Sequence, residues 1–293
     1  MWRIIATAMT GSAQGRILVI LFLSILTFVS AKVIFFFFVQ LYRILAICLY
    51  LWKRNFTIDF RTMMILLSAL LPALLLLLYI IKKDTKPEPT SKVLKAIIWG
   101  VIIIFPVAIL EQLVDGVLFG GGEPVSVAGN IFRAFFTAAI PEESFKLLAL
   151  WIVLRNNPYF DEHFDGIVYA VCIGLGFAGL ENIAYVFSSG EFWLQTAVSR
   201  ALLAVPGHYA FAVLMGYYYS KFHFVERSFT NGICIILVPV LAHGIYDSLA
   251  MAGSLNPYLG GLTTVLLIWF CIRMHRRAKT KLLAMVEKDR MMV

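Results

Sequence analysis

The chain has 293 residues, of which 61% are hydrophobic and only 14% are charged, and its formal net charge is +8. A soluble domain is about 45 to 50% apolar and about 25% charged, so this composition excludes a soluble protein and predicts a polytopic membrane protein. The positive charge does not indicate nucleic-acid binding, because the lysines and arginines lie between apolar runs and at the C-terminus.

Region 1–60 is predicted to be a membrane anchor or interfacial region, with one crossing in an apolar run that Lys32 and Arg43 interrupt. Two alternatives stay open. The run could cross twice, or its first part could be a cleavable secretory signal, because a basic start and the sequence Val29-Ser30-Ala31 resemble one.

Seven further apolar segments each approach the roughly 20 residues that a helix needs to cross a bilayer. They cover residues 62–81, 96–118, 131–154, 166–187, 194–219, 229–250 and 257–272. The predicted fold class is therefore all-α, a transmembrane helix bundle of about eight spans. We expect residues 61–275 to form this bundle and residues 276–293 to form a basic cytoplasmic tail.

The loops between these segments alternate in charge along the chain. Lysine or arginine occurs in the loop 82–92, at Arg155, at Lys221 and in the tail that begins at Arg273, whereas three loops contain neither. Those three loops cover residues 119–130, 188–192 and 252–256. By the positive-inside rule, the basic loops and both termini are expected in the cytoplasm.

Charged residues in the middle of the segment 131–154 are the strongest functional signal. Glu142, Glu143 and Lys146 follow Pro141 in an otherwise apolar run. An ionisable group at membrane depth costs about 2.5 to 3.5 kcal/mol, so these groups need partners. Helical spacing lets Lys146 lie over either glutamate, so one ion pair and one further carboxyl group are expected, and the latter can exchange protons as a general base. Pro141 predicts a kink.

Three other segments carry an ionisable residue at similar depth. Glu181 follows a glycine-rich stretch that lets helices approach closely, His208 lies in the middle of its segment, and His243 precedes Asp247 by one helical turn. An aspartate in that position can fix the tautomer of the imidazole. We expect Glu142, Glu181, His208 and His243 to meet at one site between the midplane and the outer third.

Three charged residues nearer the ends of their segments are interpreted differently. Glu111, Asp115 and Arg200 are expected to reach toward the membrane surface with long or exposed side chains, and they are left out of the predicted site.

The combined motifs resemble those of the PrsW family of intramembrane proteases. They are Glu142-Glu143-x-x-Lys146, Phe177-x-x-x-Glu181-Asn182, His208 and His243-x-x-x-Asp247. The similarity extends over about residues 70–250. The related prenyl-protein proteases and bacteriocin-processing enzymes share the two-glutamate motif but have a histidine at the position of Glu181.

The resemblance implies a peptidase that cuts a single-span, membrane-anchored substrate, such as an anti-sigma factor, in the bacterial cytoplasmic (inner) membrane. It implies that Glu142 or Glu143 activates water while Lys146 holds the pair. The residues that would bind a metal, or else position water and the oxyanion, are Glu181, His208 and His243, with Asp247 beside them. Glutamate and histidine suit zinc, but the sequence has no HExxH motif, so both options stay open.

Two other classes of membrane protein use buried acids and histidines. A proton-coupled transporter would show two halves with matching hydropathy, which this sequence lacks. A non-catalytic scaffold would keep the helix bundle and tolerate the loss of Glu142. The sequence does not predict the oligomeric state.

Overall fold

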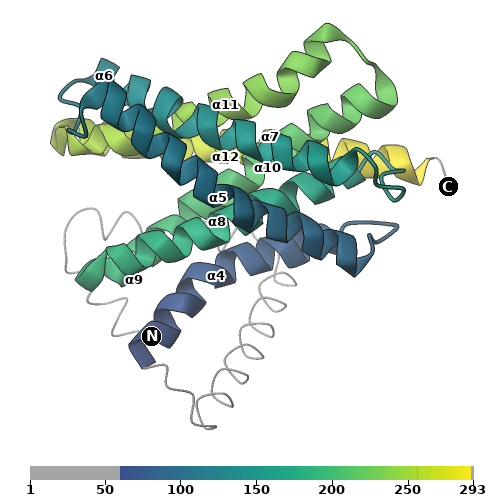
Figure 1. Cartoon of the computed structure of the whole chain (residues 1–293), viewed down its shortest axis with the longest axis horizontal. Helices are drawn as coiled ribbons and strands as arrows, with labels where there is room; N and C mark the ends of the chain where they lie inside the picture. The colour runs from purple at the N-terminus through teal and green to yellow at the C-terminus, as the bar shows by residue number, and fades with distance from the viewer. Residues whose placement is uncertain (1–59, 256, 292–293) are drawn as a thin grey trace.

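The computed structural model describes residues 60–255 and 257–291 (Figure 1). Within these ranges every regular element is a helix. The α-helices are α4 (Phe60–Ile81), α5 (Thr90–Phe119), α6 (Val127–Arg133), α7 (Ile140–Leu154), α8 (Asp165–Ser188), α9 (Trp193–Ser199), α10 (Val205–Ser220), α11 (Phe229–Met251) and α12 (Pro257–Arg290). The crossing predicted within residues 1–59 lies outside the described residues.

Six helical stretches in the described part of the chain are long and apolar enough to cross a membrane. They are Phe60–Ile81, Thr90–Phe119, Asp165–Ser188, Gly190–Val225, Phe229–Met251 and Tyr258–Arg290. The remaining predicted segment, 131–154, is also helical, but it carries Arg133 and the charged residues after Pro141. The all-α character predicted from the sequence is therefore confirmed for the described residues, which contain six candidate spans, whereas the total of about eight spans and the cytoplasmic placement of both termini stay predictions.

Helix α8 forms the centre of the bundle and packs against α4, α5, α7 and α10 (Figure 1). Glycines allow its backbone to touch that of α5. A Cβ atom at Gly100 would lie 2.1 Å from the carbonyl oxygen of Ile173, and one at Gly176 would lie 2.4 Å from that of Ile97. Both distances are far inside van der Waals contact, so this crossing requires glycine on each helix.

Two prolines near the site each follow a π-helical segment. Ala134–Ala139 precedes Pro141, and Arg200–Ala204 precedes Pro206. Proline lacks an N–H group and its ring clashes with the preceding turn, whereas the wider π-helical turn keeps the chain helical through that point. The local change that the sequence predicts at Pro141 as a kink thus takes the form of a π-helical segment.

The loops that the sequence groups by charge also lie together in space. Lys86 forms an ion pair of 2.5 Å with Asp161, and His163 forms one of 2.7 Å with Asp289. These contacts join the α4–α5 loop, the α7–α8 loop and the end of α12 at one end of the bundle, which we call the basic-loop end.

Helix α12 extends well beyond the predicted end of its span near residue 272 (Figure 1). Ala278, Leu282 and Met285 are each 1% exposed, and the ammonium of Lys281 lies 3.8 Å from the ring centroid of Tyr217 on α10. The segment expected to be a basic tail is therefore helical up to Arg290 and packs against the bundle.

The α5–α8 crossing gives a prediction for stability. Gly100→Ala should destabilise the protein by about 1 to 3 kcal/mol, because the added methyl group overlaps a backbone oxygen that cannot rotate away. Thermal unfolding in detergent would measure the effect as a lower Tm.

The matched control is Gly116→Ala on the same helix, where no described atom lies within 4 Å of the added Cβ. It should be neutral or slightly stabilising, by up to about 1 kcal/mol, since alanine favours a helix over glycine. Equal effects of the two substitutions would contradict the close crossing.

Candidate active site

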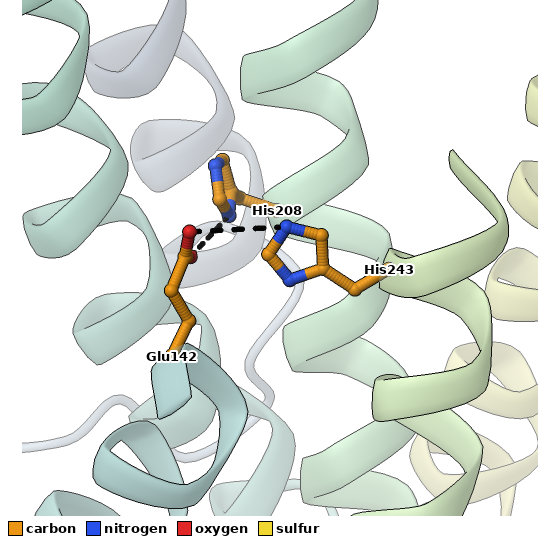
Figure 2. Close-up of side chains that lie close together, drawn as sticks. All are labelled: Glu142, His208 and His243. Carbon is orange, nitrogen blue, oxygen red and sulfur yellow. Dashed lines mark ion pairs between the residues drawn. The ribbon is translucent and has the colours of Figure 1, made fainter. Parts of the chain in front are cut away.

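Ionisable residues from four helices lie together in one buried group. Figure 2 shows three of these residues, Glu142, His208 and His243. Glu142, Glu143 and Lys146 come from α7, Glu181 from α8, His208 from α10, and His243 with Asp247 from α11. Glu143 is 0% exposed, and Glu142, Lys146, His208 and His243 are all at most 5% exposed. All seven residues predicted for the site belong to this group.

Lys146 connects the two glutamates with a histidine of another helix. Its Nζ atom lies 2.7 Å from Glu142 Oε2, 2.9 Å from Glu143 Oε1 and 3.2 Å from His208 Nδ1. An ammonium group has three donors, so these three contacts use its whole hydrogen-bonding capacity. The ammonium of Lys146 also lies over the ring of Phe177, with Nζ 4.4 Å from the ring centroid.

These contacts assign the tautomer of His208. An ammonium group cannot accept a hydrogen bond, so Nδ1 must present its lone pair to Lys146. The proton then resides on Nε2, which donates to Glu181 Oε2 at 2.9 Å. The lone pair on Nδ1 therefore faces the side of the site where Glu142 lies.

His243 is held on both of its ring nitrogens. Nδ1 lies 2.9 Å from Glu143 Oε1, and Nε2 lies 3.2 Å from Asp247 Oδ2. The ring of Phe211 stacks on the imidazole, with the centroids 4.7 Å apart and the planes at 18°. The ring orientation is thus fixed by two carboxylates and one aromatic face.

Arg200 is a site residue that the sequence interpretation missed. Its Nη2 lies 2.7 Å from Glu181 Oε2, and its Nε donates to Asn182 Oδ1 at 2.7 Å. Asn182 in turn donates to the carbonyl oxygen of Ala69 at 2.6 Å. Arg200 therefore anchors Glu181 instead of reaching for the membrane surface. Glu181 has no basic residue within one turn on its own helix. This absence indicates that a cation on another helix must balance the charge of Glu181.

Glu111 on α5 is a second residue that the sequence interpretation placed outside the site. It is half-buried and interacts electrostatically with Glu142, Glu181, Lys146 and His243. Asp115, one turn further along α5, instead pairs with Arg133 Nε at 2.8 Å. Glu111 thus contributes to the electrostatic field at the site, whereas Asp115 is held by Arg133.

Three of these residues are arranged so that one ion could contact all of them. Ligand atoms of Glu142, His208 and His243 lie within 4.8 Å of one another. The Glu142 carboxylate lies 3.9 Å from His208 Nδ1 and 3.9 Å from His243 Nε2 (Figure 2). Two imidazoles and one carboxylate form a donor set known from catalytic zinc sites. The predicted set had Glu181 in place of Glu142, whereas Glu181 contacts the other nitrogen of His208.

The charge of this group also fits a divalent cation. Four carboxylates surround it, from Glu142, Glu143, Glu181 and Asp247, and two cations balance them in part, Lys146 and Arg200. A cation at the triad would replace the proton that His243 Nε2 otherwise donates to Asp247, and with both imidazoles then neutral, two negative charges remain within this group of described residues. Each histidine of the triad also contacts a carboxylate through its other nitrogen, as metal-bound histidines usually do.

Comparisons with known proteins identify the family. The family model described as PrsW family intramembrane metalloprotease matches residues 88–274. Protease PrsW of Geobacillus kaustophilus is 35% identical over 212 residues, which cover 71% of this chain and 89% of the relative. Protease PrsW of Bacillus subtilis is 34% identical over 219 residues, 74% of this chain and 96% of the relative. No solved structure matches the chain. The resemblance predicted from the motifs is thereby confirmed, and the chain belongs to the PrsW family of intramembrane proteases.

Proposed function

We propose that this protease hydrolyses a peptide bond of a single-span membrane protein, within or next to the transmembrane helix of that substrate. The observation that supports this proposal is the buried group of Glu142, Glu143, His208 and His243, which four contacts fix in place. Such a group provides a proton acceptor and metal donors in a region of low dielectric constant, where electrostatic effects on a reaction are large.

We infer that Glu142, His208 and His243 hold a zinc ion, because their donor set and the surrounding charge suit one. The single lone pair of His208 Nδ1 would then face the ion in place of the Lys146 ammonium, which would keep its contacts with Glu142 and Glu143. A bound zinc would supply Lewis acidity for the attack of water on the scissile carbonyl group. Glu181 would orient His208 by accepting its Nε2 proton, and Glu143 would orient His243 through Nδ1.

Glu143 is the general base in this proposal. Its Oε1 atom is held by Lys146 and His243, whereas its Oε2 atom is buried and accepts no hydrogen bond from the described residues. That second oxygen is free to take a proton from water during the attack and to pass it to the leaving amine. Lys146 keeps the carboxylate in place, and Asp247 holds the more exposed side of His243.

The burial of the site has a consequence for the substrate. A peptide bond can reach Glu142 or Glu143 only after helices of the bundle separate, because both side chains are at most 6% exposed. The substrate must also unwind locally, since its own helix hydrogen bonds cover the scissile carbonyl group. We place the protein in the bacterial cytoplasmic membrane, with the basic-loop end and the C-terminus in the cytoplasm, and an anti-sigma factor is a substrate of the proposed type.

The proposed base can be tested by a conservative substitution. Glu143→Gln keeps the size of the side chain but removes its basicity, so cleavage should fall by about 10²- to 10⁴-fold. Glu142→Gln should have an effect of similar size, because it removes a metal donor. The measurement is cleavage of a tagged single-span substrate in membranes, with the amount of protease checked by immunoblot.

The control for this experiment is Glu191→Gln, which changes an exposed glutamate at the opposite end of α8 from the basic loops. It should cleave like the wild type. If Glu143→Gln and Glu142→Gln both retained full cleavage, a transporter or a non-catalytic scaffold would explain the buried group better.

Arg200 is proposed as a positioning residue. Arg200→Lys keeps the charge but loses one of the two contacts, to Glu181 or to Asn182. Zinc affinity should fall by about 10- to 100-fold, because Glu181 then orients His208 less well. Zinc retained after dialysis against a graded chelator series would be measured by elemental analysis.

A matched variant is Arg133→Lys, which alters a comparable arginine–carboxylate pair near the non-basic end of the bundle. It should retain zinc like the wild type. Equal zinc loss from both variants, or from neither, would contradict the positioning role of Arg200.

A further inference from the structure

A second group of acidic residues lies at the basic-loop end, far from the proposed active site. Asp84 lies in the α4–α5 loop, Glu162 in the α7–α8 loop, and Asp165 is the first residue of α8. Oxygen atoms of these three residues lie within 4.8 Å of one another. Glu181 follows Asp165 by sixteen positions on the same helix, about 24 Å at the usual rise per residue.

Two oxygens of this acidic group are buried without a donor. Asp165 is 1% exposed, and its Oδ2 accepts the backbone N–H groups of Asp161 at 3.0 Å and Glu162 at 2.7 Å. Its Oδ1 receives no hydrogen bond from an N–H or hydroxyl donor among the described residues, and neither does Oε2 of Glu162, although the carboxyl groups of Asp165 and Glu88 lie close enough to share a proton. A buried acceptor without a donor is destabilising, and more so when it is charged, so these oxygens favour the binding of a ligand.

The surroundings of these oxygens carry excess negative charge. Glu88, Asp161 and Asp289 lie close enough to interact with the group, whereas the nearby cations are Lys86, which pairs with Asp161, and Arg290. Glu88 accepts a hydrogen bond from the hydroxyl of Tyr169, and Asp289 accepts one from His163 N–H at 2.9 Å. Six carboxylates among the described residues thus face Lys86, Arg290 and the imidazole of His163, which pairs with Asp289.

We propose that Asp84, Glu162 and Asp165 bind a divalent cation of the hard type, Ca²⁺ or Mg²⁺. All three ligands are carboxylates, and hard cations prefer oxygen donors, whereas zinc sites usually include histidine or cysteine. A surface cavity of about 460 Å³ is lined by Thr85, Lys86, Glu162 and Arg290, so Glu162 is the ligand that faces solvent. The bound ion would join the α4–α5 loop to the start of α8.

The binding of each ion can be measured on the purified full-length chain in detergent. Calorimetric titration with CaCl₂ and, separately, MgCl₂ should show one saturable site for at least one ion, and that ion should raise the Tm. Glu162→Gln should weaken this binding by at least about tenfold, since it removes a ligand. Glu162 is the least buried of the three ligands, so this variant disturbs folding least.

Two controls separate this site from other effects. Glu287→Gln removes an acid at the same end of the bundle whose side chain is 65% exposed, and it should bind the ion like the wild type. His243→Ala removes a donor of the proposed active site and should also keep the binding. Asp84→Asn should repeat the loss seen with Glu162→Gln.

Several outcomes would overturn the proposal. One is the absence of saturable Ca²⁺ or Mg²⁺ binding by the wild type, which would mean that shared protons relieve the charge of the acidic group. Another is equal binding by Glu162→Gln, Asp84→Asn and Glu287→Gln. A third is loss of binding only in His243→Ala, which would assign the ion to the active site.

Discussion

The site depends on the three simultaneous contacts of the Lys146 ammonium with Glu142, Glu143 and His208. A buried carboxylate without a counter-charge costs about 3 to 5 kcal/mol, so two adjacent glutamates in an apolar bundle need this cation. The contact of Lys146 with His208 also sets the tautomer of this histidine, so that its Nε2 donates a hydrogen bond to Glu181. Arg200 pairs with the same carboxylate and balances its charge. One ion pair on α7 thus determines the arrangement of groups on α8 and α10.

Backbone geometry brings these side chains close enough to interact. At the α5–α8 crossing, glycines have no side chain between the two helices, so the backbones approach each other closely. The π-helical segments Ala134–Ala139 and Arg200–Ala204 each add residues to a turn just before the site residues of α7 and α10. Arg200 is the first residue of the second segment and donates to Glu181, and in both cases a regular helix with proline in its first turn follows. The π-helical segments therefore lie directly before the parts of α7 and α10 that carry the charged site residues.

The sequence predicts features that depend on one helix alone. Apolar length predicts the seven described helical segments, and the spacing of three and four residues predicts that Lys146 can reach either glutamate. The sequence interpretation expected one ion pair, whereas the structure shows Lys146 paired with both glutamates. Features that depend on the rotation of one helix against another are not predictable in this way. Arg200 and Glu111 looked like residues near helix ends, and Glu142 replaces Glu181 in the metal-capable triad, because π-helical turns and glycine contacts determine which faces meet. The helical extension of α12 was hidden by its exposed basic residues, although its buried face is apolar.

An experimental structure of the zinc-loaded protein, with anomalous scattering measured at the zinc edge, tests the convergence of the four helices most directly. The account predicts one zinc peak in contact with Glu142, His208 and His243, with Glu181 on the far nitrogen of His208 and Lys146 beside both glutamates. It would be contradicted if these side chains pointed to separate faces of the bundle, or if the zinc peak lay away from all three.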